Sequence, residues 1–592
     1  MHVIATAGHV DHGKSALVRA LTGMEPDRWA EEIRRGMTID LGFCWTSLAE
    51  GIDIAFVDVP GHERFVANML AGVGPAPAVL FVVAADEGWR AQSAEHLAAI
   101  DALGVRHGLL AVTRSDLASP QSAMADATER IARSSLGEVE SVAVSSVTGE
   151  GLAELRAALG RLAGALPPPD TAADVRLWAD RSFTITGHGL VVTGTLTAGT
   201  ISAGDELMVV PGDRRVRVRG LQALRENRTR VAAAARVAVN LRDRSHHLDP
   251  GDVRRGSALV APGRWLTTTV ADVRLSGPGP HELPGEMMLH IGTSGTGVRV
   301  RPLGGDTARL TLGAPLPLRI GDSAVLRYPG RNPGKQLIVA GVTVLDVLPP
   351  PLRRRGAAAV RAVELAGMTG DGDAAAELRR RKLARRADLA AMGAPPRGQP
   401  IAGDWMADPG WWCELGGRLR DAVEAHAGRH PLEPGLPAET ARRQLGLPDR
   451  RLVEALVRAP LVYEGGKIYG SGAAPGLPPG VHDAVEVIRA DLGRHPFVAP
   501  DAIRLRELRL GSRQLAAAVR AGYLLRVSQE VYLLPGADEQ AVRILAALPQ
   551  PFTLSQARQA LATTRRVAVP LLEMLDRTGR TERLDESLRR VR

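Results

Sequence analysis

A glycine-rich segment near the start of the chain, residues 8–15 with the sequence GHVDHGKS, strongly limits what the chain can fold into. A short apolar run precedes this segment, and residues 16–21 follow it with the apolar spacing of a helix. A strand, a glycine-rich turn and a helix in this order are typical of a P-loop, in which backbone N–H groups and the helix N-terminus surround phosphates. We therefore expect an α/β nucleotide-binding domain. Its predicted phosphate-binding residues are Asp11, His12, Gly13, Lys14, Ser15, Ala16 and Gly61.

Two further segments supply groups that a magnesium-nucleotide site requires. Residues 55–58 have the pattern of a buried strand that ends in Asp58, and Gly61 follows shortly after it. The Gly61 N–H can meet a γ-phosphate, so this turn would sense whether that phosphate is present. Thr38, between the two phosphate motifs, offers a hydroxyl that could close over the metal. Hydroxyl and carboxylate oxygens suit Mg²⁺, and the predicted metal set is Ser15, Thr38 and Asp58.

The segment TRSD at residues 113–116 predicts a guanine-binding site. It follows an apolar strand-like run and is related to the Asn-Lys-x-Asp sequence that reads guanine. Asp116 can accept hydrogen bonds from two guanine donors, which adenine does not supply in that geometry. Thr113 replaces the usual Asn and is a weaker positioning group, so guanine affinity is left open. The predicted base-binding set is Thr113, Arg114 (whose stem could cover the base), Asp116, and Ser145 and Ser146, which could present backbone N–H to guanine O6.

The chain of 592 residues is too long for one hydrophobic core, and its pattern changes twice. It first alternates apolar strands with helices, as a doubly wound α/β domain does. After prolines 167–169 it consists of short β-type runs, which fit two β-barrels. After prolines 349–351, helical stretches followed by two-stranded ribbons recur, which indicates tandem winged helices. The expected domains are 1–168 (nucleotide-binding), 169–262 and 263–349 (barrels), and 350–480 and 481–592 (winged-helix pairs).

Composition excludes several other classes. Cys44 and Cys413 are too few and too far apart for a disulfide framework or a metal site. No apolar run is long enough to span a bilayer and no secretory signal is present, so we expect a cytoplasmic protein without a membrane partner. The formal net charge of +9 is compatible with an RNA partner, although an excess of arginine is weak evidence for one.

Together these motifs resemble those of the translational GTPases, and most closely those of the bacterial selenocysteine-specific elongation factors. Residues 8–15 are close to the form that elongation factor Tu and its relatives share. Residues 35–43, 62–70 and 180–185 are nearer to the selenocysteine factors. Near the C-terminus, residues 564–566 and 570–573 resemble the last winged helix of that family. The similarity is strong to about residue 350, weakens through 352–480 and recovers at the end.

The resemblance implies a GTPase that uses GTP/GDP and Mg²⁺, acts as a monomer and delivers selenocysteinyl-tRNA to the ribosome at recoded UGA codons. Its final winged helices would bind a hairpin in the messenger RNA. His62 matches the family's catalytic histidine, which orients the attacking water. The RNA contacts implied are Arg565, Arg566, Arg589 and Arg590.

The family's aminoacyl pocket matches Asp180, Arg181 and Arg236. A selenol is much more acidic than a thiol, whose ordinary pKa is about 8.5, so selenocysteine is largely an anion at neutral pH. Two guanidinium groups would favour that anion and leave their charge uncompensated against serine or cysteine. Asp180 could hold Arg181 in position.

Three other functions are compatible with parts of the chain. A general Tu-like elongation factor would end near residue 350–400 and needs no RNA-binding extension. A GTPase subunit for sulfate activation has no use for winged helices. An RNA-binding regulator with a purely structural nucleotide is the non-enzymatic alternative, and His62 argues against it.

Overall fold

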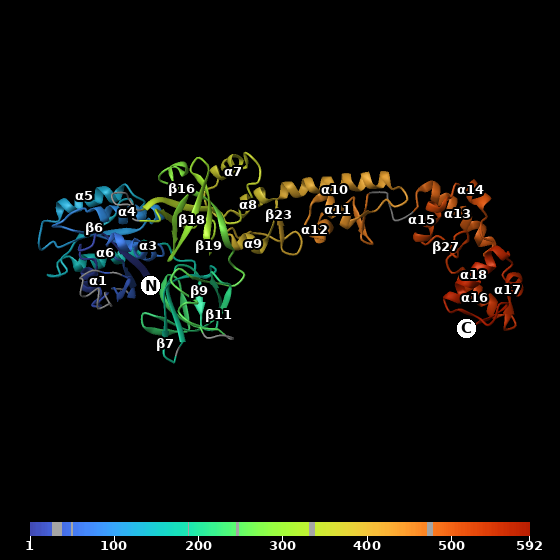
Figure 1. The fold of residues 1–592 in the computed structure, drawn as a ribbon, viewed down its shortest axis with the longest axis horizontal. Helices are drawn as coiled ribbons and strands as arrows, with labels where there is room; N and C mark the ends of the chain where they lie inside the picture. The colour runs from blue at the N-terminus through green and yellow to red at the C-terminus, as the bar shows by residue number, and fades with distance from the viewer. Residues whose placement is uncertain are drawn as a thin grey trace. The chain divides into compact units, whose positions relative to one another are not determined.

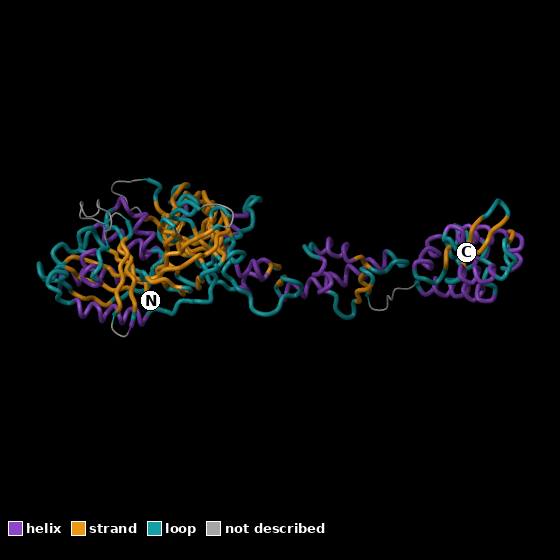
Figure 2. Tube along the Cα trace, turned by 90° about the horizontal axis from the view of Figure 1, so that it is seen from below, coloured by secondary structure: helices purple, strands orange, loops and turns teal. Residues whose placement is uncertain are grey.

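The computed structural model describes residues 1–26, 38, 40–48, 51–187, 189–243, 248–330, 338–470 and 477–592. Residues 35–37 and 39, part of a segment that carries the family resemblance, lie outside the described residues. The chain divides into two compact units (Figure 1), Met1–Glu377 with Arg385–Gly398, and Leu378–Ala384 with Gln399–Arg592. The first unit holds an α/β domain and two β-barrels, and helices predominate in the second (Figure 2). The expected fold class is confirmed.

The α/β domain is built on a six-stranded sheet in the order β2-β3-β1-β4-β5-β6, in which only β2 is antiparallel. Strands β1, β4 and β5 are almost continuously apolar because helices cover both faces of the sheet. Helices α1 and α6 pack on one face, and α3, α4 and α5 pack on the other. The strands are β1 (His2–Ala7), β2 (Gly42–Ser47), β3 (Asp53–Asp58), β4 (Ala78–Ala84), β5 (Gly108–Thr113) and β6 (Glu140–Ala143). The helices are α1 (Lys14–Thr22), η2 (Glu63–Phe65), α3 (Val66–Val73), α4 (Ala91–Leu103), α5 (Gln121–Ala132) and α6 (Leu152–Ala165).

The first barrel closes through six strands in the order β10-β15-β7-β8-β14-β11, because β11 pairs back onto β10. Its alternation is plain in β11, where Val216 and Val218 are buried between exposed arginines. The strands are β7 (Arg176–Ile185), β8 (Gly189–Leu196), β9 (Thr200–Ser202), β10 (Glu206–Val210), β11 (Arg214–Ala223), β12 (Glu226–Arg228), β13 (Arg230–Ala232), β14 (Ala235–Arg242) and β15 (Ala258–Val260).

The second barrel is a closed ring in the order β16-β19-β18-β17-β20-β21. Its strands are β16 (Thr267–Ser276), β17 (Glu286–Ile291), β18 (Ser294–Gly304), β19 (Thr307–Pro317), β20 (Ser323–Arg327) and β21 (Ile338–Asp346), with η3 (Pro280–Glu282) between the first two. Helix α7 (Ala357–Ala366) packs on its β18 and β19. Buried Arg361 of α7 pairs with two fully buried carboxylates of this barrel, Asp272 at 2.7 Å and Asp346. Residues 357–366 are therefore held on the barrel, although they follow the boundary expected at 349.

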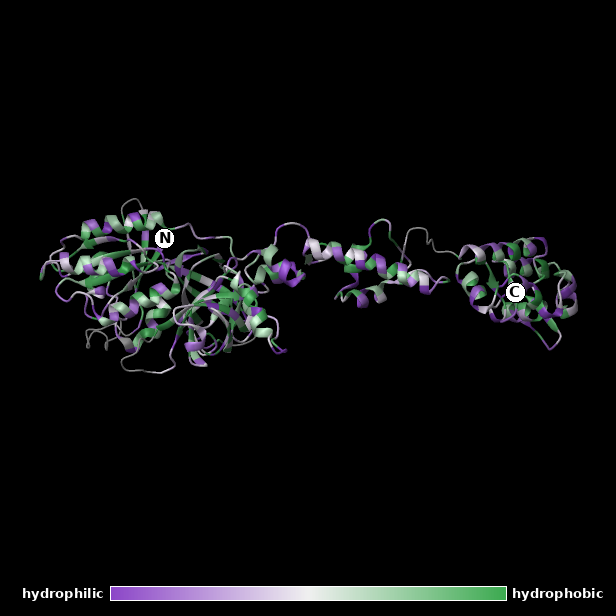
Figure 3. Ribbon diagram, turned by 90° about the horizontal axis from the view of Figure 1, so that it is seen from above, coloured by the Kyte–Doolittle hydropathy of each residue, from purple (hydrophilic) through white to green (hydrophobic). Residues whose placement is uncertain are grey.

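The remaining described chain forms small helical modules with short ribbons. Two units have the expected form of a helix followed by a two-stranded ribbon: α12 (Arg450–Leu456) with β25 (Val462–Glu464) and β26 (Lys467–Tyr469), and α15 (Ser512–Arg520) with β27 (Leu525–Arg526) and β28 (Tyr532–Leu533). The last two modules, within residues 477–592, share one apolar core that includes Ile488, Phe552 and Leu571. Figure 3 colours the hydrophobic segments of these modules green. None of the described helices is long and apolar enough to cross a bilayer. The elements are α8 (Ala374–Arg381), β22 (Leu383–Arg385), α9 (Arg386–Ala391), β23 (Trp405–Ala407), α10 (Pro409–Arg429), β24 (Leu436–Pro437), α11 (Ala438–Leu445), α12 (Arg450–Leu456), β25 (Val462–Glu464), β26 (Lys467–Tyr469), α13 (Pro479–Arg494), α14 (Ala502–Glu507), α15 (Ser512–Arg520), β27 (Leu525–Arg526), β28 (Tyr532–Leu533), α16 (Ala537–Ala546), β29 (Phe552–Thr553), α17 (Leu554–Ala560), α18 (Arg565–Arg577), β30 (Thr581–Arg583) and β31 (Leu588–Val591).

Candidate functional site

The glycine-rich turn between β1 and α1 has the backbone shape that a phosphate cradle needs. Gly8 and Gly13 have φ angles of 129° and 78°, in the region that favours glycine. A Cβ on Gly8 would lie 2.1 Å from the carbonyl oxygen of Val82, so no other residue fits there. The Lys14 ammonium donates hydrogen bonds to the carbonyls of Gly8 and His9, at 3.0 and 2.7 Å. The lysine thus lies inside the turn, where phosphate oxygens would meet it.

The three predicted metal ligands come together beside this turn. The Ser15 hydroxyl donates to Oδ2 of Asp58 at 2.6 Å, and its Oγ lies 2.9 Å from Oγ1 of Thr38. Oδ1 of Asp58 accepts a hydrogen bond from the Thr6 hydroxyl at 2.7 Å, which orients the buried carboxylate. The set consists of hard oxygen donors, which fits a magnesium ion.

The turn after β3 lies directly against the P-loop. A Cβ on Gly61 would fall 2.5 Å from the Val10 nitrogen and 2.7 Å from the Lys14 ammonium, so only glycine allows this approach. His62 follows and is partly buried. Its Nδ1 accepts the backbone N–H of Arg64 at 3.1 Å, so the proton of the neutral ring lies on Nε2.

Helix α4 contributes two residues that sequence reasoning missed. Nδ1 of His96 accepts the Gly8 N–H at 3.1 Å, and Oε1 of Gln92 accepts the Val10 N–H at 3.1 Å. Burial, reinforced by the Lys14 cation, lowers the pKa of His96 to about 3, so the ring is neutral and keeps an acceptor for Gly8. The only signal in the sequence is two polar residues spaced i, i+4, which an exposed helix face would also show.

Two of the predicted base-binding residues contact the P-loop. The Thr113 hydroxyl donates to the His12 carbonyl at 2.7 Å and so ties β5 to the phosphate turn. The Arg114 guanidinium pairs with Asp86 and Glu87, both at 2.9 Å, and also donates to the Asp11 carbonyl. Asp116 is exposed.

The expectation for Ser145 needs correction. Its N–H donates to the carbonyl of Glu150 at 3.0 Å, and its hydroxyl accepts the N–H groups of Val147 and Thr148. Ser145 therefore shapes the turn instead of offering its N–H to a base. Ser146 is partly exposed beside it.

Two arginines of the first barrel face one aromatic ring of the α/β domain. The Arg236 guanidinium lies 3.6 Å from the centroid of the Phe43 ring, and that of Arg181 lies 5.1 Å from it. They line a cavity of about 250 Å³ together with Phe43, Trp45, Phe183 and Arg225. Two guanidinium groups that line this cavity provide positive charge for an anionic ligand that enters it.

The expected partner of Arg181 is wrong. Asp180 accepts hydrogen bonds from Arg236 and from the Thr193 hydroxyl at 2.7 Å. Arg181 instead pairs with Asp40 at 3.1 Å and donates to the Leu41 carbonyl. The reason is that neighbouring residues of a strand point to opposite faces, and β7 is bulged between Ala179 and Arg181.

The four predicted RNA-binding arginines have different environments. Arg565, in the first turn of α18, is exposed, and exposed Arg590 pairs with Glu582 at 3.0 Å. Arg589 is buried and pairs with Asp576 at 3.0 Å, because alternate residues of β31 face the core. This position corrects the expectation of a free surface group.

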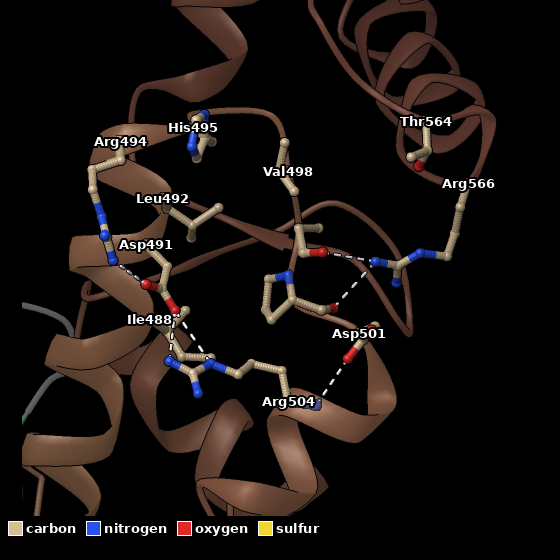
Figure 4. A pocket seen from close by; sticks show the side chains of 12 residues that line it. Ile488, Asp491, Leu492, Arg494, His495, Val498, Asp501, Arg504, Thr564 and Arg566 are labelled. Atoms are coloured by element: carbon tan, nitrogen blue, oxygen red, sulfur yellow. Dashed lines mark hydrogen bonds and ion pairs between the residues drawn. The ribbon is translucent and has the colours of Figure 1, made fainter.

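Arg566 is also engaged within the protein. Its guanidinium donates to the carbonyls of Ala499 and Pro500, at 2.7 and 3.2 Å, and so joins the last two modules (Figure 4). It borders a cavity of about 560 Å³ between these modules. Arg566 is exposed, as Arg565 and Arg590 are, but its guanidinium is already hydrogen bonded to the protein backbone.

Comparisons with known proteins agree with this geometry. Residues 1–164 match the elongation factor Tu GTP binding domain, and residues 543–589 match a winged helix of elongation factor SelB. The P-loop, the adjoining Gly61 turn and the two barrels define a translational GTPase.

The particular family follows from similarity over the whole chain. The selenocysteine-specific elongation factor of Escherichia coli is 30% identical over 628 residues, covering 98% of this chain and 97% of that protein. That of Desulfomicrobium baculatum is 36% identical over 392 residues, or 64% of this chain and 61% of the relative. The crystal structure of a bacterial selenocysteine-specific elongation factor has the same fold, with a TM-score of 0.71, 23% identity and complete coverage of both chains. The chain belongs to the family of selenocysteine-specific elongation factors.

Proposed function

We propose that this GTPase carries selenocysteinyl-tRNA to the ribosome at recoded UGA codons and binds a hairpin of the messenger RNA through its C-terminal winged helices. The observation that carries the proposal is that Arg181 and Arg236 both lie beside the Phe43 ring and line a cavity next to the nucleotide-binding domain. A general elongation factor must accept side chains of every charge, so two cations at that position would not serve it.

In the proposed nucleotide site, Lys14 and the N–H groups of residues 11–16 and Gly61 bind the phosphates. Ser15, Thr38 and Asp58 hold Mg²⁺, which when bound neutralises charge on the phosphate oxygens. Their mutual distances of 2.6 and 2.9 Å support this role. His62, with its proton on Nε2, orients the attacking water once the ribosome has positioned it. Asp116 reads guanine, while Thr113 and Arg114 hold the P-loop against the base site.

Selenocysteine selection rests on charge. Asp180 fixes Arg236 through hydrogen bonds to a carboxylate that is nearly fully buried. Asp40 and the Leu41 carbonyl fix Arg181 separately. The two guanidinium groups therefore keep their positions beside the Phe43 ring. Among the described side chains, three arginines share two carboxylates here, because Asp40 pairs with both Arg181 and Arg255, and this leaves one excess positive charge. A selenolate compensates that charge, whereas serine leaves it uncompensated in a partly buried site, which costs binding free energy.

For the RNA-binding part, we propose the modules within 350–480 and 481–592 as winged-helix pairs. Arg565 and Arg590 contact RNA phosphates directly, because their side chains are exposed. Arg566 and Arg589 act indirectly by holding the surrounding backbone. The domain division at 168, 262 and 349 remains part of this proposal. Action as a monomer belongs to it as well.

The test is protection of the aminoacyl ester. The purified protein with a non-hydrolysable GTP analogue should slow deacylation of selenocysteinyl-tRNA far more than that of seryl-tRNA on the same tRNA body, and GDP should abolish the protection. Equal protection of the two esters would reject the proposed role. Single-turnover GTP hydrolysis with and without ribosomes separates the GTPase carrier from a regulator with a structural nucleotide.

A further inference from the structure

Each of the two pocket arginines has its own carboxylate partner, and the two carboxylates come from different domains. Asp180, which pairs with Arg236, belongs to the same barrel as its arginine. Asp40, which pairs with Arg181 at 3.1 Å, belongs to the nucleotide-binding domain and directly precedes Leu41 and β2. The position of Arg181 therefore depends on a residue outside its own barrel.

Asp40 joins two arginines of the barrel at once. Its Oδ2 faces Arg181 and its Oδ1 faces Arg255, each at 3.1 Å. The side chains of Asp40, Arg181 and Arg255 are 24%, 22% and 31% exposed, so solvent screens these pairs only partly.

The two arginines also retain hydrogen-bonding capacity. Within the described part of the chain, Nε of Arg181 and one Nη of Arg255 are buried and have no hydrogen-bond partner. A buried donor without an acceptor is costly, and an anion entering beside these groups would remove that cost. Asp40 thus fixes the arginines without using all their donors.

The chain links Asp40 closely to the nucleotide site. Thr38 stands only two residues before it, and its Oγ1 lies 2.9 Å from the Ser15 hydroxyl in the proposed magnesium set. Two residues span at most about 7 Å of extended chain. Thr38 and Asp40 cannot separate further than this, so a larger displacement of Thr38 when the γ-phosphate leaves must move Asp40 as well.

We propose that Asp40 is a positioning residue that places Arg181 for the selenolate only while Thr38 is held at the nucleotide site. This inference rests on the proposed function and adds the route by which the nucleotide state reaches the amino-acid pocket. The coupling is reciprocal: binding of the selenocysteinyl ester also stabilises the arrangement of Thr38 that GTP favours.

If Asp40 had the opposite role, its removal would change the affinity for selenocysteinyl-tRNA in the opposite direction. If Asp40 competed with the selenolate for Arg181, its removal would raise affinity for selenocysteinyl-tRNA, because the pocket would gain one net positive charge. A positioning role predicts that affinity falls, since Arg181 loses the carboxylate that fixes its guanidinium. The direction of the change therefore decides between them.

The experiment measures dissociation constants of selenocysteinyl-tRNA and seryl-tRNA for the full-length protein, at saturating non-hydrolysable GTP analogue and at saturating GDP. The variants are Asp40→Asn, which keeps size and removes charge, and Arg255→Gln, which loosens Asp40 from the other side. Asp126→Asn is the matched control, because Asp126 forms an ion pair with Arg130 on the surface of α5. Melting curves confirm that each variant is folded.

We expect Asp40→Asn to weaken selenocysteinyl-tRNA binding about tenfold with the GTP analogue. Its binding of selenocysteinyl-tRNA with GDP, and its binding of seryl-tRNA, should change by less than about twofold. Arg255→Gln should also weaken selenocysteinyl-tRNA binding with the GTP analogue, and the control Asp126→Asn should match the wild type. Unchanged or tighter binding by Asp40→Asn overturns the inference. A wild-type protein that does not prefer selenocysteinyl-tRNA over seryl-tRNA overturns the proposed function itself, whatever the variants do.

Discussion

Replacing Gly61 with alanine should separate GTP binding from GDP binding. The turn that contains Gly61 approaches the P-loop so closely that a Cβ would lie 2.5 Å from the Val10 nitrogen and 2.8 Å from the Val10 Cα. Ordinary van der Waals contact begins at about 3.4 Å, so the turn must retreat by about 0.9 Å. The clashing atoms belong to the backbone of Val10. The Val10 N–H donates to the Gln92 side chain, and this hydrogen bond restrains that backbone from moving away.

The size of the effect follows from this overlap. Forcing one extra methyl group into a packed site costs about 1–3 kcal/mol. In the proposed site only a γ-phosphate needs the Gly61 N–H, so this cost is expected for the GTP-bound form and not for the GDP-bound form. The preference for GTP over GDP should therefore decrease by a factor of about 5–150.

The assay is equilibrium titration with fluorescent GDP and with a fluorescent non-hydrolysable GTP analogue. Gly164→Ala is the matched control, because it adds the same methyl group in helix α6, where nothing lies within 4 Å of it. An unchanged ratio of the two affinities in Gly61→Ala would show that the turn does not meet the γ-phosphate and would refute the reasoning.

Three further predictions concern a buried ion pair, a buried histidine and two arginines of α18. Arg361→Leu should lower the free energy of unfolding of the first unit by about 3–5 kcal/mol in a urea titration, because Asp272 and Asp346 stay buried without that guanidinium; an unchanged midpoint would contradict it. Burial, with a smaller effect of Arg327, lowers the pKa of His290 to about 4, so only the unfolded state gains this proton as the pH falls below about 6.5, and stability is lost. His290→Asn should thus make the decline of unfolding free energy between pH 6 and 4.5 shallower by about 1.4 kcal/mol per pH unit, and parallel curves would disprove this. Arg565→Ala should weaken binding of the RNA hairpin without lowering the melting temperature, whereas Arg566→Ala should lower both, because its carbonyl partners lose their donor; identical behaviour of the two variants would refute the distinction.

Local motifs were predictable because their function is built into contiguous backbone. A P-loop binds phosphate through its own N–H groups, so the glycines of residues 8–15 reveal the shape of the turn without any distant contact. The same holds for Gly61 beside Asp58 and for helix-ribbon units such as α12 with β25 and β26. Each can be recognised from fewer than about twenty consecutive residues.

The partners of side chains depended on the tertiary structure. His96 and Gly8 are 88 residues apart, and Arg181 lies 140 residues from Leu41. Whether Asp180 holds Arg181 or Arg236 depends on a strand bulge and on which face of β7 meets the nucleotide-binding domain.

By itself, then, the sequence determined the class of this protein and the phosphate and metal residues that we propose, because their spacing along the chain carries that information. The aminoacyl residues followed from the resemblance to the family. Only the tertiary structure decided that Asp40 reaches Arg181, that Arg589 is buried and Arg590 is not, and that Arg361 fixes α7 on the second barrel. These contacts join segments that the sequence leaves independent, and only the packing of specific faces against one another brings their charges together.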